Sequence, residues 1–400
     1  MNKNVLLISA VFPPEPIVSA SLSKDIASEL AKENNVTVLC PTPTRPHGFD
    51  FDNEIDAKDY KVVRLNSYTC SASKIVGRFK ESYSFGKHCY KYIAENKKNI
   101  DVIYANTWPL LAQYFTVKAA KKYKTPIIIH VQDVYPESLS NKIPLLSFLF
   151  NFILLPLDKY VLQNTTRIIA ISSKMKNYLV KTREIKSVKI EVVQNWQDEE
   201  AFIKYEMPIN LAHVSNKPFT FMYLGNIGPV AGIDLLIEAF VKSELKNCRL
   251  VIAGSGSQKE ILQEKVNSLK LTTIEFCEVP NGKVPEIQAQ ADVMLLPIKR
   301  GAAASSIPSK LPAYMFSKKP IIASVDQDSD TARVINAACC GWVLPPENIL
   351  SLSEMIKQVV STSNEVLLEK GKKGFGYAIE NLSKKNNLAK MVKCITDVIV

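Results

Sequence analysis

Short apolar runs alternate with helical patterns along the whole chain. In the first half, the apolar runs occupy residues 4–9, 36–40, 61–65, 101–105, 126–131, 167–171 and 189–193. Continuous apolar runs of this length are typical of strands in a parallel sheet that is buried on both faces. Between the runs, apolar residues recur at spacings of three and four, as Leu22, Ile26 and Leu30 do. The alternation predicts βαβ units and therefore an open, doubly wound α/β domain.

A break in this rhythm lies between residues 196 and 217, where charged and amide side chains replace the apolar runs. Strand-like runs then resume at 219–224, 249–253, 273–277, 293–297, 320–324 and 342–344. The predicted organisation is an N-terminal domain over 1–200, a linker over 201–217, a second α/β domain over 218–380, and a C-terminal helix over 381–400 that can return to the first domain. Two such domains normally bind ligand in the cleft between them, at the carboxyl ends of their strands.

The charge of the chain is concentrated in one region. Of 400 residues, 46% are hydrophobic and 22% charged, which is typical of a folded globular protein. Lys and Arg number 50 against 39 Asp and Glu, but residues 61–190 alone hold 22 basic and 7 acidic side chains. This segment faces an anionic partner: a nucleic acid, an anionic membrane surface or a phosphorylated substrate. A basic face that is merely solvated is the alternative.

Several classes of protein are excluded by what the sequence contains. The 8 cysteines form no C-x-x-C pair, so neither a zinc site nor a disulfide framework is indicated. The N-terminus lacks a signal-peptide pattern and reads as a first strand. The longest apolar stretch, 143–157, is shorter than the roughly 18–20 residues that span a bilayer. We expect a soluble or peripheral protein in the cytoplasm.

Three junctions between a predicted strand and a helix in the second half are rich in Gly or small residues. Gly lets backbone N–H groups approach a phosphate, and the start of a helix adds positive partial charge. Each junction alone is also explained by turn geometry. Three on one sheet edge, with hydroxyl and basic side chains, indicate a diphosphate site. The candidate residues there are Gly225, Asn226, Gly228, Gly254, Gly256, Arg300, Ser305, Ser306, Ser309 and Lys310.

The order of motifs along nearly the whole chain is similar to that of a known family. The motifs of the second half are FMYLGNIG (221–228), IDLLIEAF (233–240), LVIAGSG (250–256), ADVMLLP (291–297) and PSKLPAYM (308–315). They resemble the donor domain of family-4 retaining glycosyltransferases, which have the GT-B fold of two Rossmann-like domains facing a cleft. In the first half, FPPE (12–15), VQDVYPES (131–138) and QNWQD (194–198) resemble the branch that adds sugars, often N-acetylated amino sugars, to lipid-linked bacterial glycans.

The resemblance implies an activity and roles for individual residues. The expected reaction moves a sugar, with retention, from a nucleotide diphosphate donor, UDP-linked, to a polyprenyl-diphosphate-linked acceptor in capsule or O-antigen synthesis. Asp133 is the expected catalytic carboxylate and Glu137 its rival. Glu15 and Ser19 lie on the acceptor side, and Val279 on the donor side. No cofactor or metal is expected. Asp326, Asp328 and Asp330 have no Gly at the sixth position and Ala337 at the twelfth, so they do not form a calcium loop, and they read as a polar loop between a strand and a helix that Asp330 caps.

The sequence departs from the family pattern at three positions. An acid that commonly grips the nucleotide ribose falls on Ala313, and the basic pair that commonly clamps the diphosphate falls on Asn226 and Ala231. Lys310 and Arg300 must then carry the charge that faces the diphosphate.

Two segments suit a membrane surface. Residues 72–98 read as a basic helix with interleaved aromatics, and 143–157 adds apolar bulk. Either segment is also compatible with a buried helix. Two other functions remain open: a nucleotide-sugar 2-epimerase of the same fold, and a noncatalytic partner subunit. Nucleic-acid binding is not expected, because no recognised module accompanies the basic region.

Overall fold

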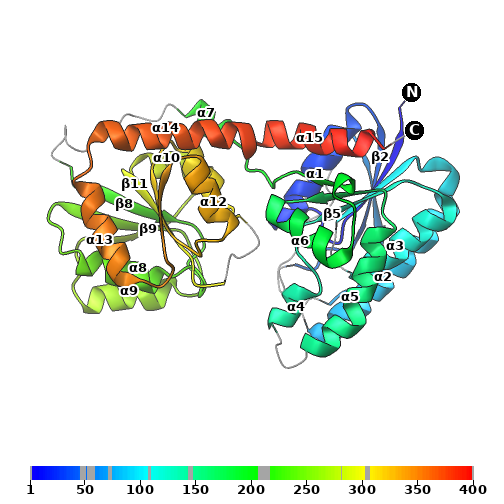
Figure 1. The fold of residues 1–400 in the computed structure, drawn as a ribbon, viewed down its shortest axis with the longest axis horizontal. Coiled ribbons are helices and arrows are strands. Elements are labelled where there is room, and N and C mark those ends of the chain that lie inside the picture. Colours follow the sequence, from blue (N-terminus) through cyan, green and yellow to red (C-terminus); the bar gives the residue numbers. More distant parts are fainter. Residues whose placement is uncertain are drawn as a thin grey trace. The chain divides into compact units, whose positions relative to one another are not determined.

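The computed structural model describes residues 2–45, 51, 59–70, 74–106, 110–142, 147–205, 217–280, 282–301 and 307–398. The chain forms two compact units: unit 1 is Met1–Asn195 with Asn387–Val400, and unit 2 is Trp196–Asn386 (Figure 1). Ser305 and Ser306 lie outside the described residues, as does most of the predicted linker.

Unit 1 contains a seven-stranded sheet in which all neighbours are parallel, with the order β3-β2-β1-β4-β5-β6-β7. The order reverses direction between β1 and β4, and open α/β sheets bind ligands at such a reversal. The strands are β1 (Asn4–Ile8), β2 (Asn35–Pro41), β3 (Lys61–Leu65), β4 (Val102–Asn106), β5 (Ile127–Val131), β6 (Arg167–Ala170) and β7 (Ile190–Val192). The helices are α1 (Val18–Ala31), α2 (Ile75–Asn96), η1 (Lys97–Asn99), α3 (Leu110–Tyr123), α4 (Glu137–Lys142), α5 (Ser147–Gln163), α6 (Ser173–Arg183) and η3 (Ser187–Lys189).

Unit 2 contains a six-stranded parallel sheet with the order β10-β9-β8-β11-β12-β13, which reverses between β8 and β11. The strands are β8 (Phe219–Leu224), β9 (Cys248–Ala253), β10 (Ile274–Cys277), β11 (Val293–Pro297), β12 (Ile321–Ser324) and β13 (Gly341–Leu344). The helices are α7 (Glu200–Lys204), α8 (Ile233–Lys242), α9 (Lys259–Ser268), α10 (Val284–Ala289), α11 (Lys310–Phe316), α12 (Asp330–Ala337), α13 (Ile349–Val360) and α14 (Asn364–Asn381). A last helix, α15 (Lys384–Thr396), begins in unit 2 and continues into unit 1.

The strands lie where the apolar runs predict them, with ends that differ by one or two residues. Every residue of β4, β5, β8 and β11 is buried, because helices cover both faces of each sheet. In unit 1, α2, α3, α5 and α6 share one hydrophobic cluster with the sheet, and α3 contacts both α2 and α5 (Figure 1). Burial on both faces leaves the strand ends as the places where polar side chains gather.

The division between the units lies at Asn195/Trp196, ahead of the predicted linker. The start of that linker is instead a helix of unit 2, because Phe202 of α7 is buried and its ring centroid lies 5.8 Å from that of Phe316. The Glu199 carboxylate accepts hydrogen bonds from the backbone N–H groups of Lys384 (2.8 Å) and Lys385 (3.3 Å). The polar residues around Phe202 in the sequence give no sign that its side chain is packed in this way.

Candidate active site

The carboxyl ends of β8 and β9 form a surface of bare backbone in unit 2. Gly225 N–H donates to the Ala253 carbonyl (3.0 Å), and Ile227 N–H donates to the Ser255 carbonyl (2.8 Å). Gly254 adopts φ +129°, and a Cβ atom there would lie 2.2 Å from the Gly225 carbonyl oxygen. The two loops are therefore in direct backbone contact, which only glycine permits.

Lys310 lies over this backbone surface. A Cβ atom on Gly225 would lie 2.1 Å from Lys310 Cε, so the lysine stem packs on the glycine. The ammonium group is 5.6 Å from the centroid of the Tyr223 ring, and burial lowers the pKa of Lys310. Within the described part of the chain, no acidic side chain pairs with it. A half-buried cation without a carboxylate partner is prepared to receive an anionic ligand.

A buried tyrosine fixes the element that carries Lys310. The Tyr314 hydroxyl of α11 donates to the Leu224 carbonyl (2.8 Å) and accepts from the Leu224 N–H (2.9 Å). Both bonds reach the last residue of β8, directly before Gly225. The start of α11 is thereby held at the glycine-rich edge.

The positions of the other predicted donor-side residues support a role in donor binding less strongly. Arg300 is 69% exposed, and its Nε atom lies 3.7 Å from the Glu347 carboxylate. Ser309 occupies the N-cap position of α11 without a side-chain capping bond. Val279 follows β10 and packs against the hydrophobic cluster of unit 2. Arg300 is therefore a weaker candidate than Lys310 for binding a diphosphate.

Two further positions complete the glycine-rich edge. A Cβ atom on Gly256 would lie 2.4 Å from the Ile227 carbonyl oxygen, and one on Gly228 would lie 3.1 Å from the Asn226 amide nitrogen. Asn226 and the predicted glycines thus lie together at this edge.

Two of the aspartates after β12 have partners within the protein. Asp326 accepts a hydrogen bond from Gly301 N–H (2.7 Å). The expectation that Asp330 caps the next helix is wrong: Ser329 is the N-cap and accepts from Ala332 N–H (3.2 Å), while Asp330 pairs with Arg333. Across the described residues, no group of three or more His, Cys, Asp and Glu side chains is placed to hold a metal ion.

In unit 1, a pocket of about 450 Å³ lies at the carboxyl ends of β1, β4 and β5. Its lining includes Ser19, Gln132 and Asp133, and the Ser19 hydroxyl donates to Gln132 Oε1 (3.0 Å). Asp133 is exposed, and its Oδ1 atom accepts a hydrogen bond from Val134 N–H (2.9 Å). The structure thus brings two sequence-predicted residues, Ser19 and Asp133, to one pocket.

Two arginines in the same pocket were not predicted as site residues. Arg45 and Arg78 both line it and both bind the buried Glu81, at 2.9 and 2.7 Å. Burial lowers the pKa of Arg45, although Glu81 opposes the shift. Two guanidinium groups that share one carboxylate keep hydrogen-bond donors for a phosphorylated ligand, although Asp133 in the same lining balances their remaining charge. The i, i+3 spacing of Arg78 and Glu81 was the available sequence signal; no motif marks Arg45.

Glu15 accepts hydrogen bonds from backbone N–H groups and does not line the pocket. Its side chain is buried, and its oxygens accept the N–H groups of Thr44 and Arg45, both at 3.0 Å, and of Phe12 at 3.2 Å. Its effect on the pocket therefore passes through Arg45, whose backbone it fixes.

Glu137 is held by a buried arginine. Its two oxygens accept from Arg183 Nη1 (2.8 Å) and Nη2 (2.7 Å), and Tyr178 also donates to it (2.8 Å). Burial works to raise the pKa of Glu137, but the hydrogen bonds and charge of Arg183 outweigh it and the pKa is lowered. Arg183 also donates to Asp158 (2.7 Å) and to the Tyr135 carbonyl (3.0 Å). This network anchors the segment that carries Asp133 and leaves Asp133 as the better placed of the two carboxylates.

Comparison with known families covers both units. The family model described as Glycosyltransferase Family 4 matches residues 21–201, and the model described as Glycosyl transferases group 1 matches residues 211–374. The chain belongs to glycosyltransferase family 4. The resemblance of its motifs to family 4 is thereby confirmed.

Curated relatives of this family-4 protein are distant. It is 25% identical over 279 residues to "Probable glycosyltransferase WbjE" of Pseudomonas aeruginosa, across 65% of this chain and 66% of that protein. It is 25% identical over 181 residues to "Putative colanic acid biosynthesis glycosyl transferase WcaI" of Escherichia coli (strain K12), across 44% of this chain and 42% of that protein. The chain thus spans just under two thirds of WbjE and less than half of WcaI.

Solved structures share the fold of this glycosyltransferase over nearly its whole length. Anabaena Alr3699/HepE in complex with UDP has a TM-score of 0.71 at 14% identity, covering 99% of this chain and 100% of that one. WaaG, a glycosyltransferase involved in lipopolysaccharide biosynthesis, has a TM-score of 0.66 at 15% identity, covering 98% and 99%. At this identity the likeness shows the fold, and the predicted α/β class and GT-B fold are confirmed.

Two departures of this glycosyltransferase from its family pattern are packed positions. Ala313 is 9% exposed and Ala231 is 6% exposed, each within a hydrophobic cluster. A charged side chain at either position would have to displace neighbouring apolar atoms. Among the described residues at this edge, Lys310 is the half-buried cation that has no carboxylate partner.

We predict that Arg183→Met strongly destabilises the glycosyltransferase. The substitution leaves Asp158, which is buried, and Glu137 without their cation, and breaking a buried ion pair costs about 3–5 kcal/mol. Urea denaturation measures the loss. Lys181→Met, at an exposed lysine of the same helix, is the control and should unfold as wild type does. A loss below about 1 kcal/mol for Arg183→Met would show that the network is not an anchor.

Proposed function

We propose that this chain is a retaining glycosyltransferase in the synthesis of bacterial surface polysaccharide. It transfers a sugar, an N-acetylated amino sugar, from a UDP-linked donor to a glycan acceptor carried on a polyprenyl diphosphate. The observation that carries the proposal is Lys310, a desolvated cation without a carboxylate partner among the described residues, lying on the bare backbone of Gly225. Family membership supports the reaction class.

The chemistry follows from where charge develops. Transfer breaks the bond between the anomeric carbon and the leaving diphosphate oxygen and forms a bond to an acceptor oxygen, which loses its proton. Negative charge grows on the diphosphate, and Lys310 at the glycine-rich edge stabilises it. Asp133 orients the acceptor hydroxyl or offsets positive charge on the sugar ring.

The choice of donor and acceptor rests on two kinds of support. A structural neighbour, Alr3699/HepE, is described in complexes with UDP and with UDP-glucose, and a sequence relative is named for colanic acid biosynthesis. In unit 1, the arginine pair at the Asp133 pocket offers positive charge to the diphosphate of a lipid-linked acceptor. The donor side thus offers Lys310 to a diphosphate, and the acceptor side offers the guanidinium groups of Arg45 and Arg78.

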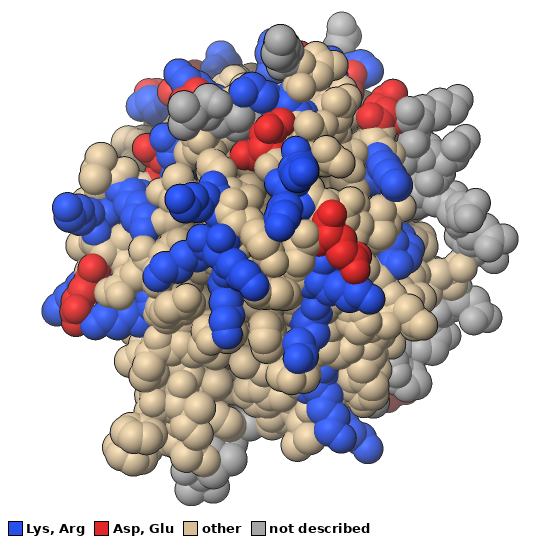
Figure 2. Space-filling view, turned by 90° about the vertical axis from the view of Figure 1, so that its right-hand side faces the viewer, with Lys and Arg blue, Asp and Glu red and all other residues tan. Residues whose placement is uncertain are grey.

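A surface of unit 1 suits an anionic membrane. The exposed lysines of α2, α3 and the residues that follow each helix are Lys80, Lys87, Lys91, Lys97, Lys98, Lys118, Lys121, Lys122 and Lys124. Several lie over tyrosine rings, as Lys87 does over Tyr83 at 5.6 Å and Lys118 over Tyr114 at 5.7 Å. Figure 2 shows blue side chains spread over this side, few red ones among them, and an uncharged region below.

The apolar segment that follows is half buried and half exposed. In α5, Leu154, Val161 and Leu162 pack into the core, whereas Phe148 and Phe152 are 82% and 73% exposed. The two phenylalanine rings stack with centroids 6.4 Å apart. Exposed aromatic residues beside a lysine-rich face are typical of peripheral membrane binding, and we place the enzyme on the inner face of the cell membrane. Within the described part of the chain, no helix has the length and hydropathy to cross a bilayer.

Lys310→Ala should weaken both donor binding and transfer. Loss of one charge-assisted contact to phosphate costs on the order of 2–4 kcal/mol in transition-state stabilisation, which is about 30-fold to 1000-fold in kcat/KM. Titration calorimetry with UDP and turnover of a panel of UDP-sugars measure the two effects.

The control for Lys310 is Lys246→Ala, at an exposed lysine of the same unit, which should stay within twofold of wild type. Activity of Lys310→Ala within twofold of wild type would refute the assignment. Absence of UDP-sugar binding in the wild type would favour a noncatalytic subunit, and interconversion of UDP-N-acetylhexosamines without an acceptor would favour an epimerase.

Asp133→Asn should separate chemistry from donor binding. We expect turnover to fall roughly 100-fold or more while the Kd for UDP stays within twofold, because the carboxylate acts on the acceptor or the sugar ring. Asp397→Asn, an exposed aspartate of the same unit, is the matched control. Asp133 also accepts the Val134 N–H, so a fall in turnover fully explained by a lower Tm would assign it a structural role.

The double variant Phe148→Ser with Phe152→Ser should release the protein from membranes. Each basic residue near an anionic surface contributes about 1 kcal/mol, so wild type should float with phosphatidylglycerol vesicles at low salt and less at high salt. We expect at least fivefold less protein to float for the variant, at unchanged Tm because both rings are exposed. Val188→Ser, 84% exposed, is the control. Wild-type protein that stays unbound at low salt would contradict the proposal.

A further inference from the structure

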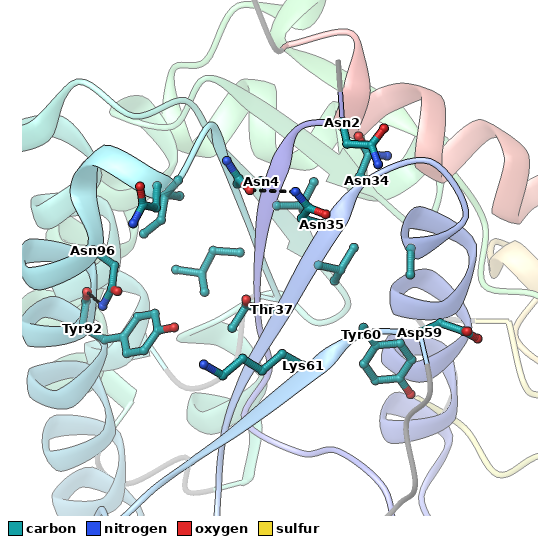
Figure 3. Close-up of a pocket in the computed structure, with 16 residues that line it drawn as sticks. Asn2, Asn4, Asn34, Asn35, Thr37, Asp59, Tyr60, Lys61, Tyr92 and Asn96 are labelled. Atoms are coloured by element: carbon teal, nitrogen blue, oxygen red, sulfur yellow. Dashed lines mark hydrogen bonds between the residues drawn. The ribbon is translucent and has the colours of Figure 1, made fainter.

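A second pocket of unit 1 lies at the opposite edge of its sheet. It encloses about 660 Å³ at the amino ends of β1, β2 and β3, whereas Ser19 and Asp133 follow the other edge (Figure 3). This volume is within the range of about 300–1,000 Å³ for ligand pockets. The pocket forms because β3 begins at Lys61, opposite Thr37, so the first residues of β2, Asn35 and Val36, extend past the edge strand.

The wall of this pocket is rich in asparagine. Six of its 16 lining residues are asparagines, from the start of β1, the turn before β2, the end of α2 and η1: Asn2, Asn4, Asn34, Asn35, Asn96 and Asn99. We call it the asparagine pocket. Amide side chains bind neutral polar ligands in fixed orientations and carry no net charge.

Three of the asparagines keep their amide oxygens available to a ligand. The Nδ2 groups donate within the protein: Asn34 to the Leu30 carbonyl (3.0 Å), Asn35 to Asn4 Oδ1 (3.2 Å) and Asn96 to the Tyr92 carbonyl (2.9 Å). Within the described residues, the Oδ1 atoms of Asn34, Asn35 and Asn96 accept no hydrogen bond. The pocket therefore offers acceptors to a ligand that brings donors.

The electrostatics of the pocket disfavour phosphate. The last residues of α1 and α2, Ala31 and Asn96, both line it, and helix C-termini carry partial negative charge. Asp59 and Lys61 add one charge of each sign. The pocket thus contrasts with the lysine-rich face of α2 and α3, and its balance of charge suits a neutral ligand with many hydroxyl groups.

An aromatic side chain completes the pocket. Tyr92 is partly exposed, and Figure 3 shows its hydroxyl directed toward Thr37 and Lys61 at the centre. The Tyr92 hydroxyl can donate a hydrogen bond. The ring supplies apolar surface for the C–H groups of a sugar.

We propose that the asparagine pocket binds a neutral oligosaccharide, separately from the transfer site. The two edges of the sheet are joined by five-residue strands such as β1 and β4, which span about 17 Å at 3.3 Å per residue. We expect the sugar residues held here to lie remote from the end of the glycan that reacts. The site does not depend on the proposed reaction, because binding needs neither donor nor turnover.

Saturation-transfer NMR on the full chain with maltotriose, cellotriose and chitotriose tests the proposal. We expect at least one trisaccharide to bind, with affinity unaffected by excess UDP. The double variant Asn35→Ala with Asn96→Ala should weaken binding at least tenfold while UDP binding and turnover stay within twofold of wild type. Alanine is a better helix former than asparagine, so the substitution in α2 preserves the fold, and Tm checks this.

The control is Asn177→Ala, at an exposed asparagine on α6, which should bind as wild type does. No binding of any of the three trisaccharides, or equal binding by the double variant, would overturn the proposal. Competition by inorganic pyrophosphate would also overturn it, since that result means a phosphate site. Wild-type protein that binds a trisaccharide but transfers no sugar from any UDP-sugar would refute the proposed function alone.

Discussion

The constraint on which the rest of this structure depends is that both sheets are parallel and covered by helices on both faces. Strands buried in this way consist mainly of apolar residues, as β4 and β5 do apart from Asn106 and His130. Polar chemistry is then confined to the loops at the strand ends. Lys310 and the bare backbone of unit 2, and Asp133 with the arginine pair of unit 1, all lie at carboxyl ends for this reason.

Carboxylates in unit 1 mostly serve arginines and backbone. Glu81 binds Arg45 and Arg78, Glu137 and Asp158 bind Arg183, and Glu15 fixes a loop. Each of these acids hydrogen-bonds within the protein, and of the three arginines only Arg45 and Arg78 line the pocket, because Arg183 is buried. Asp133 differs because it is exposed at the pocket.

The sequence predicts the strands well because apolar runs report burial on both faces, a property that is local in the chain. It predicts Lys310 and the glycines because turn residues follow strands at short spacing. It misses Arg45, because the Glu81 that holds it lies 36 residues away. It also cannot separate Glu137 from Asp133, because Arg183, which makes the difference, is 46 residues from Glu137. Phe202 is misread as linker for the same reason: its partner Phe316 is remote in the chain.

The backbone contact between Gly225 and Gly254 has a consequence for how such a protein diversifies. Two loops that touch through a carbonyl oxygen and an α-carbon accept no side chain at either position. Substitution of either glycine is therefore not neutral. The backbone surface that faces the ligand there stays chemically the same when other parts of the sequence change. Differences in donor selectivity therefore have to come from the side chains that border the glycines. These side chains can vary without displacing the backbone surface between them.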